Sequence, residues 1–201
     1  MTRPSLLGAV LAGGKSQRYG RDKSADSIVG KPLAVRAAET LAEVFSSVVI
    51  VSSNMRVVTD WPHVPDLREG YGPLAGIEAA LQYAADEALD GIFVLACDLP
   101  LVDANIVRCV SLALGEQKVV APQRTAFPGV EPLCAAYHVS CLETVVDALE
   151  RGELAVYQIF EALNGRVIRL SEESFLNVNT PEDREVAIAA LRREADERGL
   201  P

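Results

Sequence analysis

The segment that follows the first apolar run carries the residues best suited to binding chemistry. Gly13 and Gly14 come soon after an apolar run at residues 6–10, which predicts a buried strand ending in a loop. Without a Cβ, the glycines let backbone N–H groups approach a bound anion closely. Although the chain has a formal net charge of −9, five cations gather nearby: Lys15, Arg18, Arg21, Lys23 and Lys31. This local reversal of charge indicates a polyphosphate-binding loop.

The glycine pair also admits three other interpretations. A glycine pair after a strand is typical of a simple tight turn. The dinucleotide-binding pattern needs G-x-G-x-x-G opening directly into a helix, whereas these glycines are adjacent. The P-loop pattern ends in Gly-Lys-Ser, as here at residues 14–16, but Ala9 stands where its first glycine is required. The cations therefore favour a phosphate-binding loop of neither standard type.

Polar residues near the ends of later apolar runs are further candidates. Asp98 follows the apolar run 92–96, and open α/β sheets bind ligands at the carboxyl ends of their strands. Asn177 and Asn179 are two residues apart, so an extended backbone points both to one side. Their amides can donate and accept hydrogen bonds. The structural alternatives are a capping or turn aspartate and an asparagine turn before the last helix.

These residues must be positioned by alternating strands and helices, the pattern of an α/β domain with a mostly parallel sheet. We expect strands at 6–10, 48–51, 92–96, 119–121, 133–137 and 167–170. We expect helices at 33–45, 74–85, 104–114, 141–149, within 151–163 and at 181–197, with Asp103, Ser140 and Thr180 as N-caps. A polar connection spans 52–73, and residues 123–129 are expected to form an exposed loop.

Composition limits the class of protein. A chain of 201 residues with 49% hydrophobic residues fits one globular domain, and its apolar runs are shorter than the roughly 20 residues of a membrane span. The N-terminus resembles a first strand more than a signal peptide, which predicts a cytoplasmic protein. The four cysteines form no C-x-x-C pair and the two histidines lack metal-ligand spacing, so we expect buried free thiols rather than zinc. The acidic balance disfavours a nucleic-acid-binding surface.

Taken in order along the chain, the motifs resemble those of the molybdenum cofactor guanylyltransferases, the molybdopterin-guanine dinucleotide biosynthesis protein A family. The resemblance rests on Leu11-Ala12-Gly13-Gly14, Arg18-Tyr19-Gly20, Lys23, Gly72-Pro73-Leu74-Ala75-Gly76, Cys97-Asp98-Leu99-Pro100 and Asn177-Val178-Asn179-Thr180-Pro181-Glu182. It implies one Rossmann-like nucleotidyltransferase domain over 1–201, with helices on both faces of the sheet. The nucleotide-binding half would span about 1–100 and the acceptor-binding half about 101–201.

The resemblance also implies an activity. Members of this family transfer GMP from GTP to the terminal phosphate of molybdenum-molybdopterin, with Mg²⁺ as cofactor and pyrophosphate as the second product. GTP and molybdopterin would be the small-molecule partners, with transient contacts to cofactor-synthesis proteins and to recipient molybdoenzymes. No nucleic acid and no membrane would be involved.

Roles follow by position from the same resemblance. Arg18, Lys23 and Asp98 correspond to catalytic residues, with Arg18 neutralising the leaving pyrophosphate and Asp98 binding the metal. Asn177 and Asn179 would face the acceptor, and Asp66 would accept hydrogen bonds from guanine. The residues implied to contact GTP are Leu11, Ala12, Gly13, Gly14, Lys23, Ser52, Asp66, Gly76 and Asp98.

The chain departs from the family pattern at three places. Ser52 stands where relatives often have asparagine, Tyr19 replaces a common methionine, and residues 151–156 lack a further basic residue. Two alternatives therefore stay open: a related enzyme such as a molybdopterin cytidylyltransferase, and a nucleotide-binding regulator that has lost turnover. Replacement of Asp66 distinguishes a guanylyltransferase from a cytidylyltransferase, since in a guanylyltransferase it should weaken GTP binding far more than CTP binding.

Overall fold

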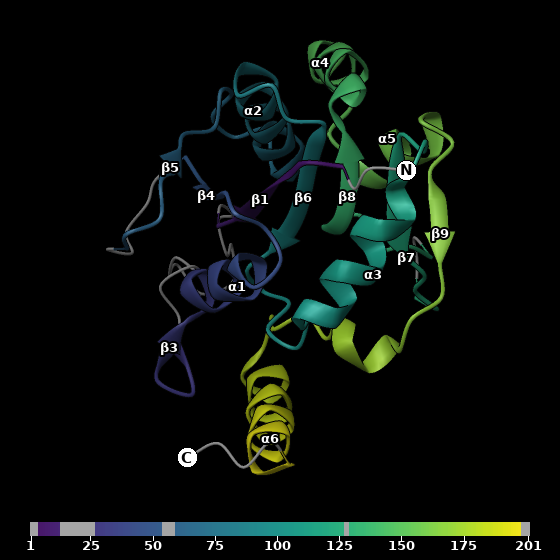
Figure 1. The fold of residues 1–201 in the computed structure, drawn as a ribbon. Helices are drawn as coiled ribbons and strands as arrows, with labels where there is room; N and C mark the ends of the chain where they lie inside the picture. The colour runs from purple at the N-terminus through teal and green to yellow at the C-terminus, as the bar shows by residue number, and fades with distance from the viewer. Residues whose placement is uncertain (1–3, 13–26, 54–58, 127–128, 198–201) are drawn as a thin grey trace.

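A seven-stranded sheet organises the part of the chain that the computed structural model describes, namely residues 4–12, 27–53, 59–126 and 129–197. Its spatial order is β5-β4-β1-β6-β8-β7-β9 (Figure 1). β8 runs antiparallel to both of its neighbours, and the other pairs in this sheet are parallel. The strands are β1 (Leu6–Leu11), β4 (Val48–Val51), β5 (His63–Val64), β6 (Gly91–Ala96), β7 (Val119–Pro122), β8 (Cys134–His138) and β9 (Arg166–Ile168).

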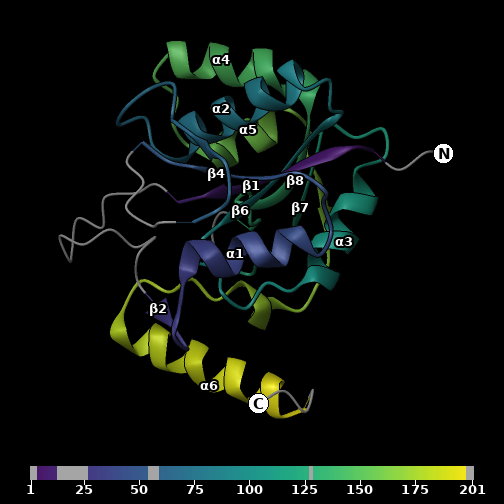
Figure 2. The same cartoon turned by 60° about the vertical axis from the view of Figure 1, so that its left-hand side comes forward.

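Helices cover both faces of this sheet (Figure 2). They are α1 (Leu33–Ala42), α2 (Pro73–Asp86), α3 (Ala104–Leu114), α4 (Leu142–Glu150), α5 (Val156–Ala162) and α6 (Pro181–Glu197). α2, α4 and α5 lie on one face, α1 and α3 lie on the other, and α6 lies on the α1 side, farther from the sheet. Smaller elements are the hairpin β2 (Ser27–Ile28) and β3 (Lys31–Pro32) and the 3₁₀ helices η2 (Val139–Cys141) and η3 (Glu172–Phe175).

The central strands are apolar along their whole length because both of their faces are covered. Every residue of β1, β4 and β6 is buried. Along β1, Leu7 and Ala9 pack into the core under α2, whereas Leu6 and Val10 pack into the core under α1 and α3. Continuous apolar runs of this kind are typical of parallel strands buried on two sides.

The predicted strands and helices are all present, with ends shifted by a few residues. β5 was missed, since two residues carry no periodicity. The prediction of Ser140 as a helix cap is wrong: η2 precedes α4, and the Ser140 N–H donates to His138 Nδ1 at 3.2 Å. Asp103 does cap α3, because its carboxylate accepts from the N–H groups of Asn105 and Ile106, both at 2.9 Å.

Candidate active site

The predicted site residues lie at the carboxyl edge of the sheet, where β4, β1 and β6 end side by side. Leu11 at the end of β1 pairs with Val51 of β4 and with Ala96 of β6. Hydrogen bonds continue one step beyond the strands, from Ala12 N to Val51 O at 2.9 Å and from Cys97 N to Leu11 O at 3.2 Å. Three predicted residues, Ala12, Ser52 and Asp98, therefore leave neighbouring strands at one edge.

The glycine loop itself lies outside the described residues. Gly13, Gly14, Arg18 and Lys23 belong to the segment 13–26, so the structure places only the strand that leads into them and the hairpin that follows. At the start of that hairpin, Arg184 of α6 donates from Nη2 to Ser27 O at 2.7 Å. Lys31, one of the five clustered cations, forms an ion pair with Glu39 of α1.

Asp66, Gly76 and Leu11 come together on the β5 side of β1. A Cβ built on Gly76 would lie 2.9 Å from Leu11 Cδ2 and 3.5 Å from Asp66 Oδ1, so a larger residue here would require the Leu11 side chain to shift. Asp66 is half-buried, and this burial raises the pKa of its carboxyl, opposed by a hydrogen bond from the Ser53 backbone and by the charge of His63. Gly72, which precedes α2, has a φ of +69°, a backbone conformation that favours glycine.

Ser52 forms hydrogen bonds with His63, a contact that the sequence did not indicate. Its side chain is buried, with 1% of the residue exposed. The Ser52 hydroxyl lies 3.2 Å from His63 Nε2, and the same nitrogen lies 2.9 Å from Ser52 O. His63 of β5 is thus linked by hydrogen bonding to Ser52, which follows β4. The charge of His63 also lowers the pKa of the Asp66 carboxyl. The residue that departs from the family's asparagine is held in a fixed place by a neighbouring histidine.

The asparagine segment meets Asp98 on the other side of β1. The backbone N–H of Val178 donates to Asp98 O at 2.9 Å. Val178 is buried in the core, Asn177 is half-buried and Asn179 is exposed. The Asn179 N–H donates to Asp183 Oδ2 at 3.0 Å, in the first turn of α6. The structure therefore brings the predicted metal ligand and the predicted acceptor-binding segment together.

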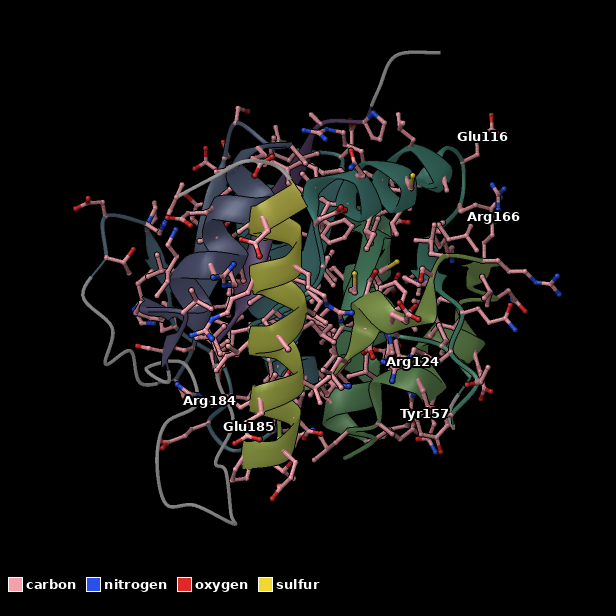
Figure 3. All side chains as sticks on the ribbon, turned by 90° about the horizontal axis from the view of Figure 1, so that it is seen from below. Glu116, Arg124, Tyr157, Arg166, Arg184 and Glu185 are labelled. Atoms are coloured by element: carbon pink, nitrogen blue, oxygen red, sulfur yellow. The ribbon has the colours of Figure 1, made fainter. Side chains whose placement is uncertain are left out.

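An ion pair beside Asp98 was missed by sequence reasoning. Arg124, expected in an exposed loop, has only 18% of its side chain exposed, and its Nη1 donates to Glu131 Oε2 at 2.8 Å. The same nitrogen donates to Phe175 O at 2.6 Å. Phe175 belongs to η3, which follows β9, so Arg124 lies beside this segment (Figure 3). An acid shortly before an apolar strand is the signal that marks Glu131, but sequence does not reveal its partner.

Burial dominates the electrostatics of Glu131. Desolvation raises the pKa of its carboxyl, and the nearby charge of Asp98 adds to the increase. Arg124, the Leu133 backbone and the Asn177 side chain, which hydrogen-bonds to Glu131, oppose it. Among the described residues, the charges acting on Glu131 are thus the Arg124 guanidinium and the Asp98 carboxylate.

The donor groups at this edge suit Mg²⁺ bound together with a nucleotide. Among the described residues, no three of His, Cys, Asp and Glu are grouped so as to hold a metal. Mg²⁺ is commonly held by one or two carboxylates, with phosphates and water completing its octahedral shell, and the Asp98 carboxylate at the strand end fits that arrangement. The four cysteines are free thiols, and Cys109, contrary to expectation, is exposed. None of the described helices is long and apolar enough to cross a membrane.

An open, mostly parallel sheet with polar groups gathered at its carboxyl edge defines a nucleotide-binding α/β protein. The class is narrowed by comparison with known families, since a family model described as the MobA-like NTP transferase domain matches residues 8–167. The chain belongs to this family and is a nucleotidyltransferase.

Two curated relatives match along most of their length. A probable molybdenum cofactor guanylyltransferase of Opitutus terrae is 36% identical over 191 residues, covering 90% of this chain and 94% of the relative. A molybdenum cofactor guanylyltransferase of Desulfosudis oleivorans is 31% identical over 202 residues, covering 94% and 96%. Molybdopterin-guanine dinucleotide biosynthesis protein A from Archaeoglobus fulgidus superposes with a TM-score of 0.77 at 25% identity, covering 94% of this chain and 100% of that structure.

Proposed function

We propose that this protein acts in molybdenum cofactor biosynthesis, in the cytoplasm, by transferring GMP from GTP to the terminal phosphate of molybdenum-molybdopterin. The products are the guanine dinucleotide form of the cofactor and pyrophosphate. The observation that carries the proposal is the arrangement of two carboxylates around one strand end. Asp66 lies on one side of Leu11 and Asp98 on the other, and this arrangement supports a nucleotide that would contact both groups. The names of the relatives support the choice of substrates.

The geometry around Asp66 supports guanine as the base. An ionised carboxylate only accepts hydrogen bonds, and guanine offers donors at its ring N–H and exocyclic amine. Cytosine has no matching pair of donors on its pairing edge, so the same carboxylate would leave part of its hydrogen-bonding capacity unused. Gly76 lets the first turn of α2 pack close to Asp66 and Leu11, so the carboxylate is held at this edge of the sheet.

The proposed chemistry is a single displacement at phosphorus. A phosphate oxygen of molybdopterin attacks the α-phosphorus of GTP, a new P–O bond forms, and the bond between the α-phosphorus and the bridging oxygen of pyrophosphate breaks. A phosphate monoester is already ionised at neutral pH, so the reaction needs no Ser-His or Cys-His pair to activate the nucleophile. Alignment and charge neutralisation supply the rate.

We assign the charge-neutralising roles to Arg18, Lys23 and Asp98. Asp98 would hold Mg²⁺, which when bound neutralises charge on the phosphate oxygens. Lys23 would contact the triphosphate and Arg18 the leaving pyrophosphate. Leu11, Ala12, Gly13 and Gly14 would meet the nucleotide through their backbone, and Asn177 and Asn179 would orient the acceptor. Contacts with the proteins that deliver the pterin or receive the product would be transient.

Asp98→Asn provides the test. Purified protein is incubated with GTP, Mg²⁺ and molybdenum-loaded molybdopterin, and pyrophosphate release is followed. The wild type should release pyrophosphate, whereas Asp98→Asn should lose turnover by about a hundredfold or more while GTP binding changes less than about threefold. Asp147→Asn, which removes an exposed carboxylate from α4 that has no assigned role in the reaction, is the matched control and should stay active. Full activity of Asp98→Asn would refute the metal role.

The same assay with CTP in place of GTP distinguishes the cytidylyltransferase alternative. GTP should support the reaction and CTP should not. A protein that binds GTP but releases no pyrophosphate in the presence of the acceptor would instead be the non-catalytic regulator.

A further inference from the structure

The ion pair between Arg124 and Glu131 lies at the carboxyl edge but holds none of the proposed substrate contacts. Arg124 follows soon after β7, and Glu131 precedes β8. Because β8 runs antiparallel to β6 and β7, its starting end meets the finishing ends of those strands. The connection between the two residues is closed by hydrogen bonds from Arg124 N to Gly129 O and from Glu131 N to Pro122 O, both 2.9 Å.

Stability alone is a poor explanation for this pair. Only 18% of the Arg124 side chain and 11% of the Glu131 side chain are exposed. Removing both charges from water costs several kcal/mol per ion, and a pair of apolar residues often stabilises a fold equally well. The other groups that Arg124 and Glu131 contact indicate a further role for the pair.

Both members reach the segment that carries Asn177. Arg124 Nη1 donates to Phe175 O at 2.6 Å, and Phe175 is itself 1% exposed in the core. Glu131 accepts a hydrogen bond from the Asn177 side chain. On the far side of Asn177, Val178 N donates to Asp98 O at 2.9 Å. The Asn177 side chain is thus held by Glu131, and backbone hydrogen bonds at Phe175 and Val178 hold the segment on either side of it.

The chemistry of the pair also sets the direction of the Asn177 amide. A carboxylate paired with a guanidinium accepts hydrogen bonds and donates none. Asn177 must therefore present its NH₂ group to Glu131, and the carbonyl oxygen of the same amide is directed away from Glu131. An amide without this partner can rotate and offer either group.

We propose that the Arg124–Glu131 pair is a positioning unit that fixes the Asn177 amide so that its oxygen accepts a hydrogen bond from an N–H or O–H group of the acceptor substrate. This inference rests on the proposed function, because it assigns a role in that reaction. Neither Arg124 nor Glu131 touches substrate in it. The pair acts through Asn177, on the acceptor and not on GTP.

A double-mutant cycle tests the proposal. Glu131→Gln keeps the size of the side chain and removes its charge. It should lower kcat/KM for molybdopterin about tenfold or more, as removal of a group that orients a ligand commonly does, while the dissociation constant of GTP changes less than about twofold. In an Asn177→Ala background the same substitution should cost less than about threefold, because its target is gone. Arg124→Ala should behave like Glu131→Gln.

Asp86→Asn is the matched control. It removes one negative charge from an exposed carboxylate that hydrogen-bonds Gln82 on α2, and kcat/KM should not change. Thermal melting of each variant shows whether it is folded. If Glu131→Gln fails to fold, Glu131→Asp replaces it in the cycle, since it keeps the charge and shortens the reach by one methylene. It should give a smaller loss that also disappears in the Asn177→Ala background.

A spectroscopic measurement examines the contact without turnover. The Asn177 side-chain amide signals in a ¹⁵N–¹H spectrum are assigned by their loss in Asn177→Ala, and Glu131→Gln should shift them while most other side-chain amides stay in place. Equal kinetic losses in both backgrounds, an unmoved Asn177 signal, or a parallel loss of GTP affinity would overturn the inference alone. A wild-type protein that releases no pyrophosphate would overturn the proposed function and this inference together.

Discussion

The position and the pKa of the Asp66 carboxyl depend on three neighbouring residues. Its carboxylate lies beside Gly76, receives the Ser53 N–H and faces the charge of His63. Burial nevertheless prevails and raises the pKa of the Asp66 carboxyl above its ordinary value of 3.8. A half-buried carboxylate that receives the Ser53 N–H can accept further hydrogen bonds from the N–H groups of a ligand.

Replacing Asp66 by Ala should weaken GTP binding about tenfold or more, because hydrogen bonds to a charged acceptor contribute about 1.5 to 3 kcal/mol each. CTP binding should fall less than about threefold. Titration calorimetry with both nucleotides measures the difference. Asp60→Ala, which removes an exposed aspartate from the same connection, should leave both affinities unchanged. Equal losses for GTP and CTP would contradict the assignment of Asp66 to guanine.

The raised pKa of Asp66 adds a pH dependence to the same measurement. Only the ionised carboxylate accepts both guanine donors, so GTP affinity should fall as pH drops through the pKa of Asp66. That fall should begin at a higher pH than an ordinary aspartate with a pKa of 3.8 would give.

At the scale of elements, α6 shows which features short-range sequence rules capture. Thr180 was predicted as its N-cap, and this is confirmed: Asp183 N donates to Thr180 Oγ1 at 3.1 Å, while Thr180 N donates to Asp183 Oδ2 at 2.8 Å. Both bonds are local, so a few neighbouring residue types were enough to predict the cap. The same local cap also receives the Asn179 N–H and so fixes the end of the asparagine segment.

Thr180→Ala should reduce the free energy of unfolding by about 1 kcal/mol, the usual cost of losing an N-cap. Urea denaturation followed by circular dichroism measures it. Ser171→Ala is a suitable control, since Ser171 precedes η3 without making a side-chain capping bond, and it should change the free energy by less than about 0.5 kcal/mol. Similar losses in the two variants would show that the Thr180 cap contributes nothing specific.

Contacts between distant segments explain what the sequence could not predict. Apolar runs that end in polar residues placed β1, β6 and Asp98 correctly, because strand ends and turn chemistry are local. Arg124 was assigned to an exposed loop because its contact with Phe175 spans 51 residues of sequence. Likewise, Ser52 gave no hint of His63, since the two-residue strand β5 that carries His63 has no pattern of its own.

At the scale of the whole molecule, the β6–β8 pairing joins the two halves of the sheet. Gly91 begins β6 opposite His138, and a Cβ at this position would lie 2.2 Å from the backbone oxygen of Tyr137. Backbone on a central strand cannot shift as a flexible side chain can. The pairing of β6 with β8 therefore requires a residue without a Cβ at position 91.

Gly91→Ala should lower the free energy of unfolding by about 3 kcal/mol or more, at the upper end of overpacking effects. Gly115→Ala is the comparison, because Gly115 has a φ of +47° but no atom within 4 Å of the position that a Cβ would occupy. Its cost should be only the backbone term for a side chain at this conformation, about 1 to 3 kcal/mol. Thermal and urea unfolding of both variants measure the difference, and an equal loss would show that the β6–β8 pairing adapts easily.

The reversed direction of β8 has a consequence for how such an enzyme can diversify. If every strand were parallel, only the segments that follow the strands would lie at the carboxyl edge of the sheet, and each of these segments would lead into a helix. One inverted strand brings the segment just before it, at Glu131, to the same edge as the segments that leave β6 and β7. Under the proposed function, changes in that short connection would alter acceptor selection, while the residues near Asp66, on the other side of β1, would stay the same.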